Sequence, residues 1–200
     1  MTLNARYDGT DPGHFRGYER HLVGCRRVLD YGCGTGGFLA WAAEKGIPAE
    51  GYEPAAEIAA EARRRGFTVR EAEPDLGRYD GLVMVCVIEH LAPAELRRIL
   101  ETFRGTVVVQ ADEPRHREPW FLFHRRSDFW DEPEHVRPYT PPALRRLLGR
   151  CGYEVVARGR VKPPLPKPWQ LRSLAVRLRL FLEDRLFGIW CPHFAVGFKG

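Results

Sequence analysis

Apolar and polar residues follow two different periodicities along most of the chain. Short apolar runs predict β-strands, and segments in which apolar residues recur every three or four positions predict amphipathic helices. Strands and helices that alternate at such short spacing are typical of a doubly wound α/β sheet. The predicted strands cover residues 27–31, 49–53, 67–70, 79–87, 105–110, 153–160 and 193–199. The predicted helices cover residues 14–22, 38–45, 54–65, 93–103, 141–150 and 169–190.

The strongest of these strands, residues 79–87, is apolar almost without interruption. Such a strand is usually buried on both faces, as in a parallel sheet. A chain of 200 residues has the size of one domain. We therefore predict a single α/β domain with a doubly wound, mostly parallel sheet of seven strands. Its expected parts are an N-terminal leader or cap at 1–24, a core at 25–162, a proline-rich linker with an amphipathic helix at 163–192, and a final strand at 193–200.

Composition and charge narrow the class of protein. The chain has 31 Lys and Arg against 26 Asp and Glu, and a formal net charge of +5 gives no strong nucleic-acid signal. No run reaches the roughly 18 uncharged apolar residues of a membrane span, and the N-terminus lacks the apolar stretch of a secretory signal. The five cysteines are scattered and include no C-x-x-C pair. This pattern argues against a disulfide framework or a zinc site, and it predicts a cytoplasmic protein with no bound metal.

The first predicted strand runs into a glycine-rich turn at residues 30–36 (DYGCGTG). Glycines allow a tight turn there and let a ligand approach the main chain. Residues 32–37 (GCGTGG) have the spacing G-x-G-x-x-G of a dinucleotide site. The aspartate that precedes this turn, Asp30, would however be a poor neighbour for the pyrophosphate of a dinucleotide. Glu53, at the end of the second strand, is placed to accept hydrogen bonds from ribose hydroxyls. Two carboxylates suit a positively charged nucleoside, which predicts S-adenosylmethionine; a generic nucleotide-binding Rossmann loop is the alternative.

Three segments in order resemble the class I S-adenosylmethionine-dependent methyltransferases, in their ubiquinone-biosynthesis-like branch (the methyltransferase 23 type). Residues 28–36 (VLDYGCGTG) are similar to the first motif of that family. Residues 79–91 (YDGLVMVCVIEHL) resemble its fourth-strand motif, and residues 135–155, which begin HVRPYTP and end GYEV, resemble a later segment. The resemblance extends over about residues 25–160 and the last strand. It implies a Rossmann-like fold, methyl transfer, and S-adenosylmethionine as the cofactor.

The resemblance also implies which residues bind the cofactor. At the adenine the family more often has Asp where this chain has Glu71. Without the glycine-rich turn beside it, Glu53 would be interpreted as a solvated strand end. Cys33 and Cys86 are expected to be small buried packing residues and not nucleophiles. The residues implied are Asp30, Gly32, Cys33 and Gly34 for the methionine part, Glu53 for the ribose, Pro54, Glu71 and Ala72 for the adenine, and Cys86 and Val87 beneath the sulfonium.

Two histidines are candidates for catalysis. Methyl transfer needs a nucleophile in line with the methyl group, and a hydroxyl acceptor needs a base for its proton. Histidine can serve as this base at neutral pH. His90, just past the strand 79–87 at the carboxyl edge of the sheet, is the first candidate and His135 is the second. The alternatives are a capping or packing role for His90 and a hydrogen bond from His135 to a loop carbonyl.

Two further segments bear on the methyl acceptor. The connection 112–138 mixes aromatic residues with Arg and His, which predicts a lid or binding loop, or else a packed cover of the core. The segment 169–190 predicts a basic amphipathic helix, for which membrane or lipid contact, packing on the domain and a dimer interface are all open. We predict O- or C-methylation of a quinone-like, lipid-linked, sugar or natural-product acceptor by a monomer or homodimer. RNA or protein methylation and a non-catalytic cofactor-binding module are the alternatives.

Overall fold

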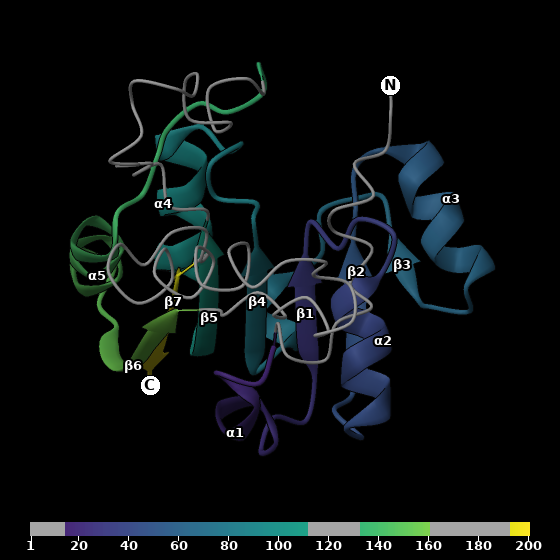
Figure 1. The fold of residues 1–200 in the computed structure, drawn as a ribbon, viewed down its shortest axis with the longest axis horizontal. Coiled ribbons are helices and arrows are strands. Elements are labelled where there is room, and N and C mark those ends of the chain that lie inside the picture. Colours follow the sequence, from purple (N-terminus) through teal and green to yellow (C-terminus); the bar gives the residue numbers. More distant parts are fainter. Residues whose placement is uncertain (1–14, 112–132, 161–192) are drawn as a thin grey trace, which may run out of the picture.

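Seven strands form one sheet in the order β3-β2-β1-β4-β5-β7-β6. The computed structural model describes residues 15–111, 133–160 and 193–200, and Figure 1 shows their arrangement. The strands β1 to β5 pair in parallel, and β7 pairs antiparallel with both β5 and β6. The predicted mostly parallel seven-stranded sheet is confirmed. The strands are β1 Val28–Tyr31, β2 Ala49–Tyr52, β3 Val69–Arg70, β4 Gly81–Val85, β5 Gly105–Ala111, β6 Glu154–Arg160 and β7 His193–Lys199.

Helices cover both faces of this sheet because successive strand residues point to opposite sides. In β1, Val28 packs with α1, α2 and α3, whereas Leu29 packs with η3, α4 and α5. Figure 1 shows α2 and α3 beside β2 and β3, and α5 beside β6. The helices are α1 Glu19–Leu22, α2 Gly37–Glu44, α3 Ala56–Arg64, the 3-10 helix η3 Leu76–Arg78, α4 Pro93–Thr102 and α5 Pro141–Arg150.

Two elements are shorter than the sequence predicts. The strand predicted over 79–87 is confined to Gly81–Val85, because Cys86 adopts a φ of 53° and leaves the extended conformation. The helix predicted over 14–22 is confined to Glu19–Leu22, and turns precede it. At Gly17 an added Cβ would lie 2.6 Å from Cζ of Phe194, so the chain passes too close to β7 for a side chain there.

The segment before β1 is part of the core. Tyr18 and Leu22 are fully buried, and Phe15 is 3% exposed. The ring of Phe15 lies 5.4 Å from that of Trp41 in α2, and the ring of Tyr18 lies 5.3 Å from that of Phe194 in β7. Aromatic contacts of this kind add to the free energy gained from apolar burial. Residues 15–22 therefore join α2 to β7 across one face of the sheet.

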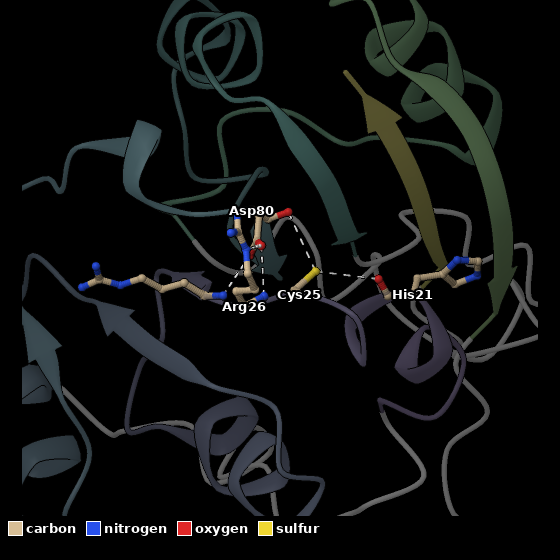
Figure 2. Close-up of polar contacts among 5 residues, drawn as sticks. His21, Cys25, Arg26 and Asp80 are labelled. Carbon is tan, nitrogen blue, oxygen red and sulfur yellow. Dashed lines mark hydrogen bonds and ion pairs between the residues drawn. The ribbon is translucent and has the colours of Figure 1, made fainter.

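Hydrogen bonds at the start of β4 hold this segment in place (Figure 2). The backbone N–H groups of Arg26 and Arg27 donate to the Asp80 carboxylate at 3.0 and 2.8 Å. The Cys25 thiol donates to the carbonyl oxygens of Asp80 and His21 at 3.8 and 3.9 Å. Burial opposes ionisation of Asp80, but the backbone hydrogen bonds from Arg26 and Arg27, together with the Arg26 side chain, lower its pKa. This cluster lies at the amino end of β4, and the predicted site lies at the carboxyl end.

Some predictions concern parts of the chain outside the described residues. These are residues 1–14 of the predicted leader, most of the connection 112–138, and the helix predicted over 169–190. The division of the chain into leader, core, linker and final strand therefore stays a prediction. Within the three described ranges, no helix is both long enough and apolar enough to cross a membrane.

Candidate active site

The glycine-rich turn links β1 to α2 with a left-handed backbone. Gly32 and Gly34 have φ values of 77° and 53°, which residues with a Cβ rarely adopt. An added Cβ at Gly32 would lie 2.6 Å from Cγ2 of Val87, so the space over Gly32 is filled by that side chain. At Gly34 an added Cβ would meet no described atom within 4 Å. The turn is therefore closed at its first glycine and open at Gly34.

Glu53 holds the turn from the neighbouring strand. It follows β2 directly, and because β2 pairs with β1, its carboxylate comes to the side of the turn. Oε2 accepts a hydrogen bond from the Gly34 N–H at 3.1 Å, and Oε1 accepts one from the Ala55 N–H at 3.0 Å. A carboxylate has about four lone-pair sites. Glu53 thus keeps capacity to accept further hydrogen bonds, as its predicted ribose role requires.

Asp30 lies beneath the turn in β1 and is 2% exposed. Its Oδ2 atom is buried and accepts no hydrogen bond from any described residue. Burial, together with the nearby carboxylate of Glu53, raises the pKa of Asp30 to about 8. A buried carboxyl without a partner is costly to ionise. A cationic ligand at the turn would supply the compensating positive charge that no described residue supplies.

Two further polar residues are fully buried in this region, Tyr18 and Gln110. The Tyr18 hydroxyl donates to Oε1 of Gln110 at 3.3 Å. Burial raises the pKa of Tyr18, and the charges of Asp30 and Cys86 act in the same direction, which places all of these groups close together. The sequence prediction omitted both residues. An amide inside the apolar strand β5 was a signal that could have found Gln110, whereas nothing local distinguishes Tyr18.

The turn after β4 lies beside the glycine-rich turn. The Cys86 N–H donates to the Gln110 carbonyl at 2.9 Å, and Val87 covers Gly32 as described above. The His90 N–H donates to the Val87 carbonyl at 3.0 Å, which closes a tight turn. Val87 therefore lies against the first glycine, and the placement of Cys86 and Val87 beneath the sulfonium stays a prediction.

The segment 135–139 docks on this turn through the backbone. The Glu89 carbonyl accepts hydrogen bonds from the Val136 N–H at 2.7 Å and the Arg137 N–H at 3.3 Å. This brings the imidazole rings of His90 and His135 to a centroid distance of 4.6 Å, with 51° between their planes. The structure thus brings together the two histidines that the sequence named separately.

The remaining predicted residues lie at the edge of the site or serve its packing. Pro54, Glu71 and Ala72 are exposed, and Glu71 forms an ion pair with Arg63 at 2.6 Å. Burial raises the pKa of the Cys33 thiol, and the charges of Asp30 and Glu53 act in the same direction, so it stays protonated. A protonated, buried thiol is a packing group and not a nucleophile. Among the residues of the three described ranges, no group of three or more His, Cys, Asp or Glu could hold a metal ion.

Comparison with known proteins identifies the family. A family model of a methyltransferase domain, of the methyltransferase 23 type, matches residues 11–158. The chain belongs to this methyltransferase family. The match confirms the predicted methyltransferase class, with S-adenosylmethionine as its cofactor. The finer prediction, the ubiquinone-biosynthesis-like branch, stays a prediction. No curated protein sequence matches the methyltransferase.

Solved structures share the fold of the methyltransferase at low sequence identity. An S-adenosylmethionine-dependent methyltransferase from Archaeoglobus fulgidus is 22% identical with a TM-score of 0.67, over 94% of this chain and 92% of that one. A methyltransferase from Haloferax volcanii, in complex with the activator Trm112, is 16% identical with a TM-score of 0.64, over 93% and 90%. Geranyl diphosphate C-methyltransferase from Streptomyces coelicolor is 17% identical with a TM-score of 0.62, over 90% and 77%. These likenesses establish the fold.

Two features of the methyltransferase site fit the cofactor. The buried Oδ2 of Asp30 offers a negative charge or a hydrogen-bond acceptor that no described residue uses. The space beside Gly34, where a Cβ would lie, is open. A cation-bearing nucleoside with an extended amino-acid arm matches both features.

Proposed function

We propose that this methyltransferase transfers a methyl group from S-adenosylmethionine to an oxygen or carbon atom of a small-molecule acceptor. The observation that supports this most directly is the contact between His90 and His135 at the turn whose Val87 side chain covers Gly32. Two imidazoles thereby lie one short turn away from the predicted cofactor. The Cys33 thiol is buried and protonated and therefore does not serve as a nucleophile.

The residues that would hold the cofactor follow the geometry of the turn. Asp30 and the backbone of Gly32 and Gly34 would hold the methionine part, and Glu53 would bind the ribose hydroxyls. When bound, S-adenosylmethionine supplies an electrophilic methyl group whose leaving group needs no proton. The remaining predicted contacts are Pro54, Glu71 and Ala72 at the adenine, and Cys86 and Val87 beneath the sulfonium.

In this proposal the histidine pair removes a proton from the acceptor. His90 accepts the proton from the acceptor hydroxyl, or from the acidic carbon, as that atom attacks the methyl group. His135 orients the ring of His90 through their contact, or exchanges roles with it. The chain's contribution is then proximity, orientation and one proton acceptor.

A small acceptor fits better than a macromolecule. The net charge of +5 is modest for a nucleic-acid binder. Geranyl diphosphate and magnesium protoporphyrin IX are the acceptors named for two methyltransferases of the same fold. A lipid-linked acceptor would suit the basic segment 169–190, which lies outside the described residues. The cytoplasmic location and the choice between monomer and homodimer stay predictions.

The direct test is incubation of the purified methyltransferase with methyl-labelled S-adenosylmethionine and fractionated cell extract. The proposal expects label in the small-molecule or lipid fraction, and labelling about 100-fold slower when His90 and His135 are both replaced by alanine. Label confined to RNA or protein would contradict the small-molecule acceptor. Binding of the cofactor without labelling of any fraction would contradict catalysis itself and favour a binding module.

A further inference from the structure

Two buried carboxyl groups on neighbouring strands have opposite surroundings. Glu50 in β2 is 7% exposed and accepts hydrogen bonds from the Nε atoms of Arg27 at 2.6 Å and Arg70 at 3.1 Å. Although burial opposes ionisation, these two guanidinium groups lower the pKa of Glu50. Asp30 in β1 is 2% exposed, and its Oδ2 has no such partner among the described residues. The first carboxylate is neutralised by the protein, and the second is not.

No described cation faces Asp30. The titratable groups that interact with it are Tyr18 from the segment before β1, Cys33 from the glycine-rich turn and Glu53 from the end of β2. Cys86, from the turn after β4, acts on Tyr18 in turn. The Tyr18 hydroxyl has one proton, and it donates that proton to Gln110. Glu53 uses its oxygens to accept backbone N–H groups and adds negative charge. The surroundings therefore favour a neutral, protonated Asp30 whenever no positive ligand is present.

We propose that binding of the cationic cofactor drives a proton from Asp30 into solvent, so that cofactor affinity rises with pH. The inference rests on the proposed function. The exchange is balanced: the protonated carboxyl loses its proton to the buffer, and the resulting carboxylate is compensated by the positive charge of the bound nucleoside. Asp30 then acts as a selector for charge, because a neutral nucleoside gives no gain that would offset ionisation of the buried group.

The test is calorimetry at about pH 6.5, where the cofactor ammonium is largely charged, in buffers of different ionisation enthalpy. The dependence of the observed heat on buffer gives the number of protons released. We expect about one proton for each S-adenosylmethionine bound. Methylthioadenosine, a neutral nucleoside that keeps the adenosine and the sulfur, is expected to bind without proton release.

Two variants separate Asp30 from other groups. Asp30→Asn is expected to bind S-adenosylmethionine at least tenfold more weakly and to release no proton. Glu50→Gln, the matched control, removes another buried carboxylate, on the next strand, and is expected to keep the release. If Asp30→Asn binds too weakly to measure, the cofactor-free proteins answer the same question: the gain in melting temperature of Asp30→Asn over wild type must grow as pH rises.

The outcomes separate this inference from the proposed function. Tight binding of S-adenosylmethionine without proton release would overturn the inference and leave the proposed function intact. Equal proton release by Asp30→Asn, or a melting-temperature gain that does not change with pH, would overturn it too. A protein that binds neither S-adenosylmethionine nor its demethylated product would contradict the proposed function.

Discussion

At the scale of single residues, Asp30 links the stability of the cofactor-free protein to pH. Its pKa is about 8 in the folded protein against 3.8 for an ordinary Asp, because it is buried next to Glu53. Between these values the folded state holds a proton that the unfolded state has lost. The free energy of unfolding therefore falls as pH rises from about 4 to about 8, and the full cost is present above that window.

Asp30→Asn removes this cost. We expect the cofactor-free variant to be more stable than wild type by on the order of 2 kcal/mol near pH 8, with a gain that vanishes near pH 4. Urea denaturation at several pH values measures it. Glu50→Gln provides the opposite sign, because the pKa of Glu50 is lowered by its arginine partners and its charge stabilises the folded state at neutral pH. A loss of stability in Asp30→Asn at pH 8 would contradict this account of the residue.

The histidine pair gives a second prediction at this scale. His90→Ala and His135→Ala are each expected to lower kcat about 100-fold, because each disturbs the proton acceptor. The double variant is expected to be no slower than the worse single variant, since the rings act as one unit. The dissociation constant for S-adenosylmethionine should change less than about twofold.

The control for the histidine variants is His21→Ala. His21 lies near the amino end of β4, away from the site (Figure 2), and its removal should leave kcat unchanged. Turnover of His90→Ala or His135→Ala at the wild-type rate would remove that histidine from the mechanism.

At the scale of elements, the glycine-rich turn must hold a left-handed backbone and must leave space for the cofactor. Substitutions at Gly32 and Gly34 can separate these two requirements. Gly32→Ala is expected to cost about 3 kcal/mol of stability, because the new Cβ combines a left-handed φ with overlap against Val87. Gly34→Ala meets only the backbone strain, about 1 kcal/mol, but its Cβ enters the open space and should weaken cofactor binding at least tenfold. Denaturation and calorimetry on the two variants measure both effects. Unchanged affinity in Gly34→Ala would show that the cofactor binds elsewhere.

The segment before β1 behaves as a core element and not as a detachable cap. Leu22 is fully buried, whereas its neighbour Val23 is 63% exposed. Leu22→Ala is expected to cost about 3 kcal/mol of unfolding free energy, and Val23→Ala, the matched control, less than about 0.5 kcal/mol. Urea denaturation of both variants measures the difference. Equal small losses would mean that this segment contributes little to the core.

At the scale of the whole molecule, local patterns and distant contacts differ in how far the sequence predicts them. Apolar periodicity located every strand and helix in the described ranges except the short η3, because each pattern is set by neighbours along the chain. The early end of β4 could not be predicted from the apolar pattern, because it depends on the unusual φ of Cys86. Nor does periodicity indicate the antiparallel entry of β7 between β5 and β6.

In the candidate site, too, some residues could be predicted from local sequence and others depend on long-range contacts. Asp30 and Glu53 follow from the ends of consecutive strands, and their closeness follows from the pairing of β1 with β2. Tyr18 and Gln110 lie 92 positions apart, and only the folded sheet brings the hydroxyl of one to the amide of the other. The contact between His90 and His135 likewise depends on backbone hydrogen bonds to Glu89. Local sequence motifs do not predict long-range contacts of this kind.

The central claim is that the carboxylates beside the glycine-rich turn select a positively charged sulfur nucleoside. Calorimetric titration of the purified chain with S-adenosylmethionine, NAD and ATP tests it most directly. The account predicts saturable binding of one S-adenosylmethionine with a dissociation constant roughly between 1 and 100 µM, and no comparable heat from NAD or ATP. Tight binding of NAD or ATP, with no heat from S-adenosylmethionine or its demethylated product, would contradict it.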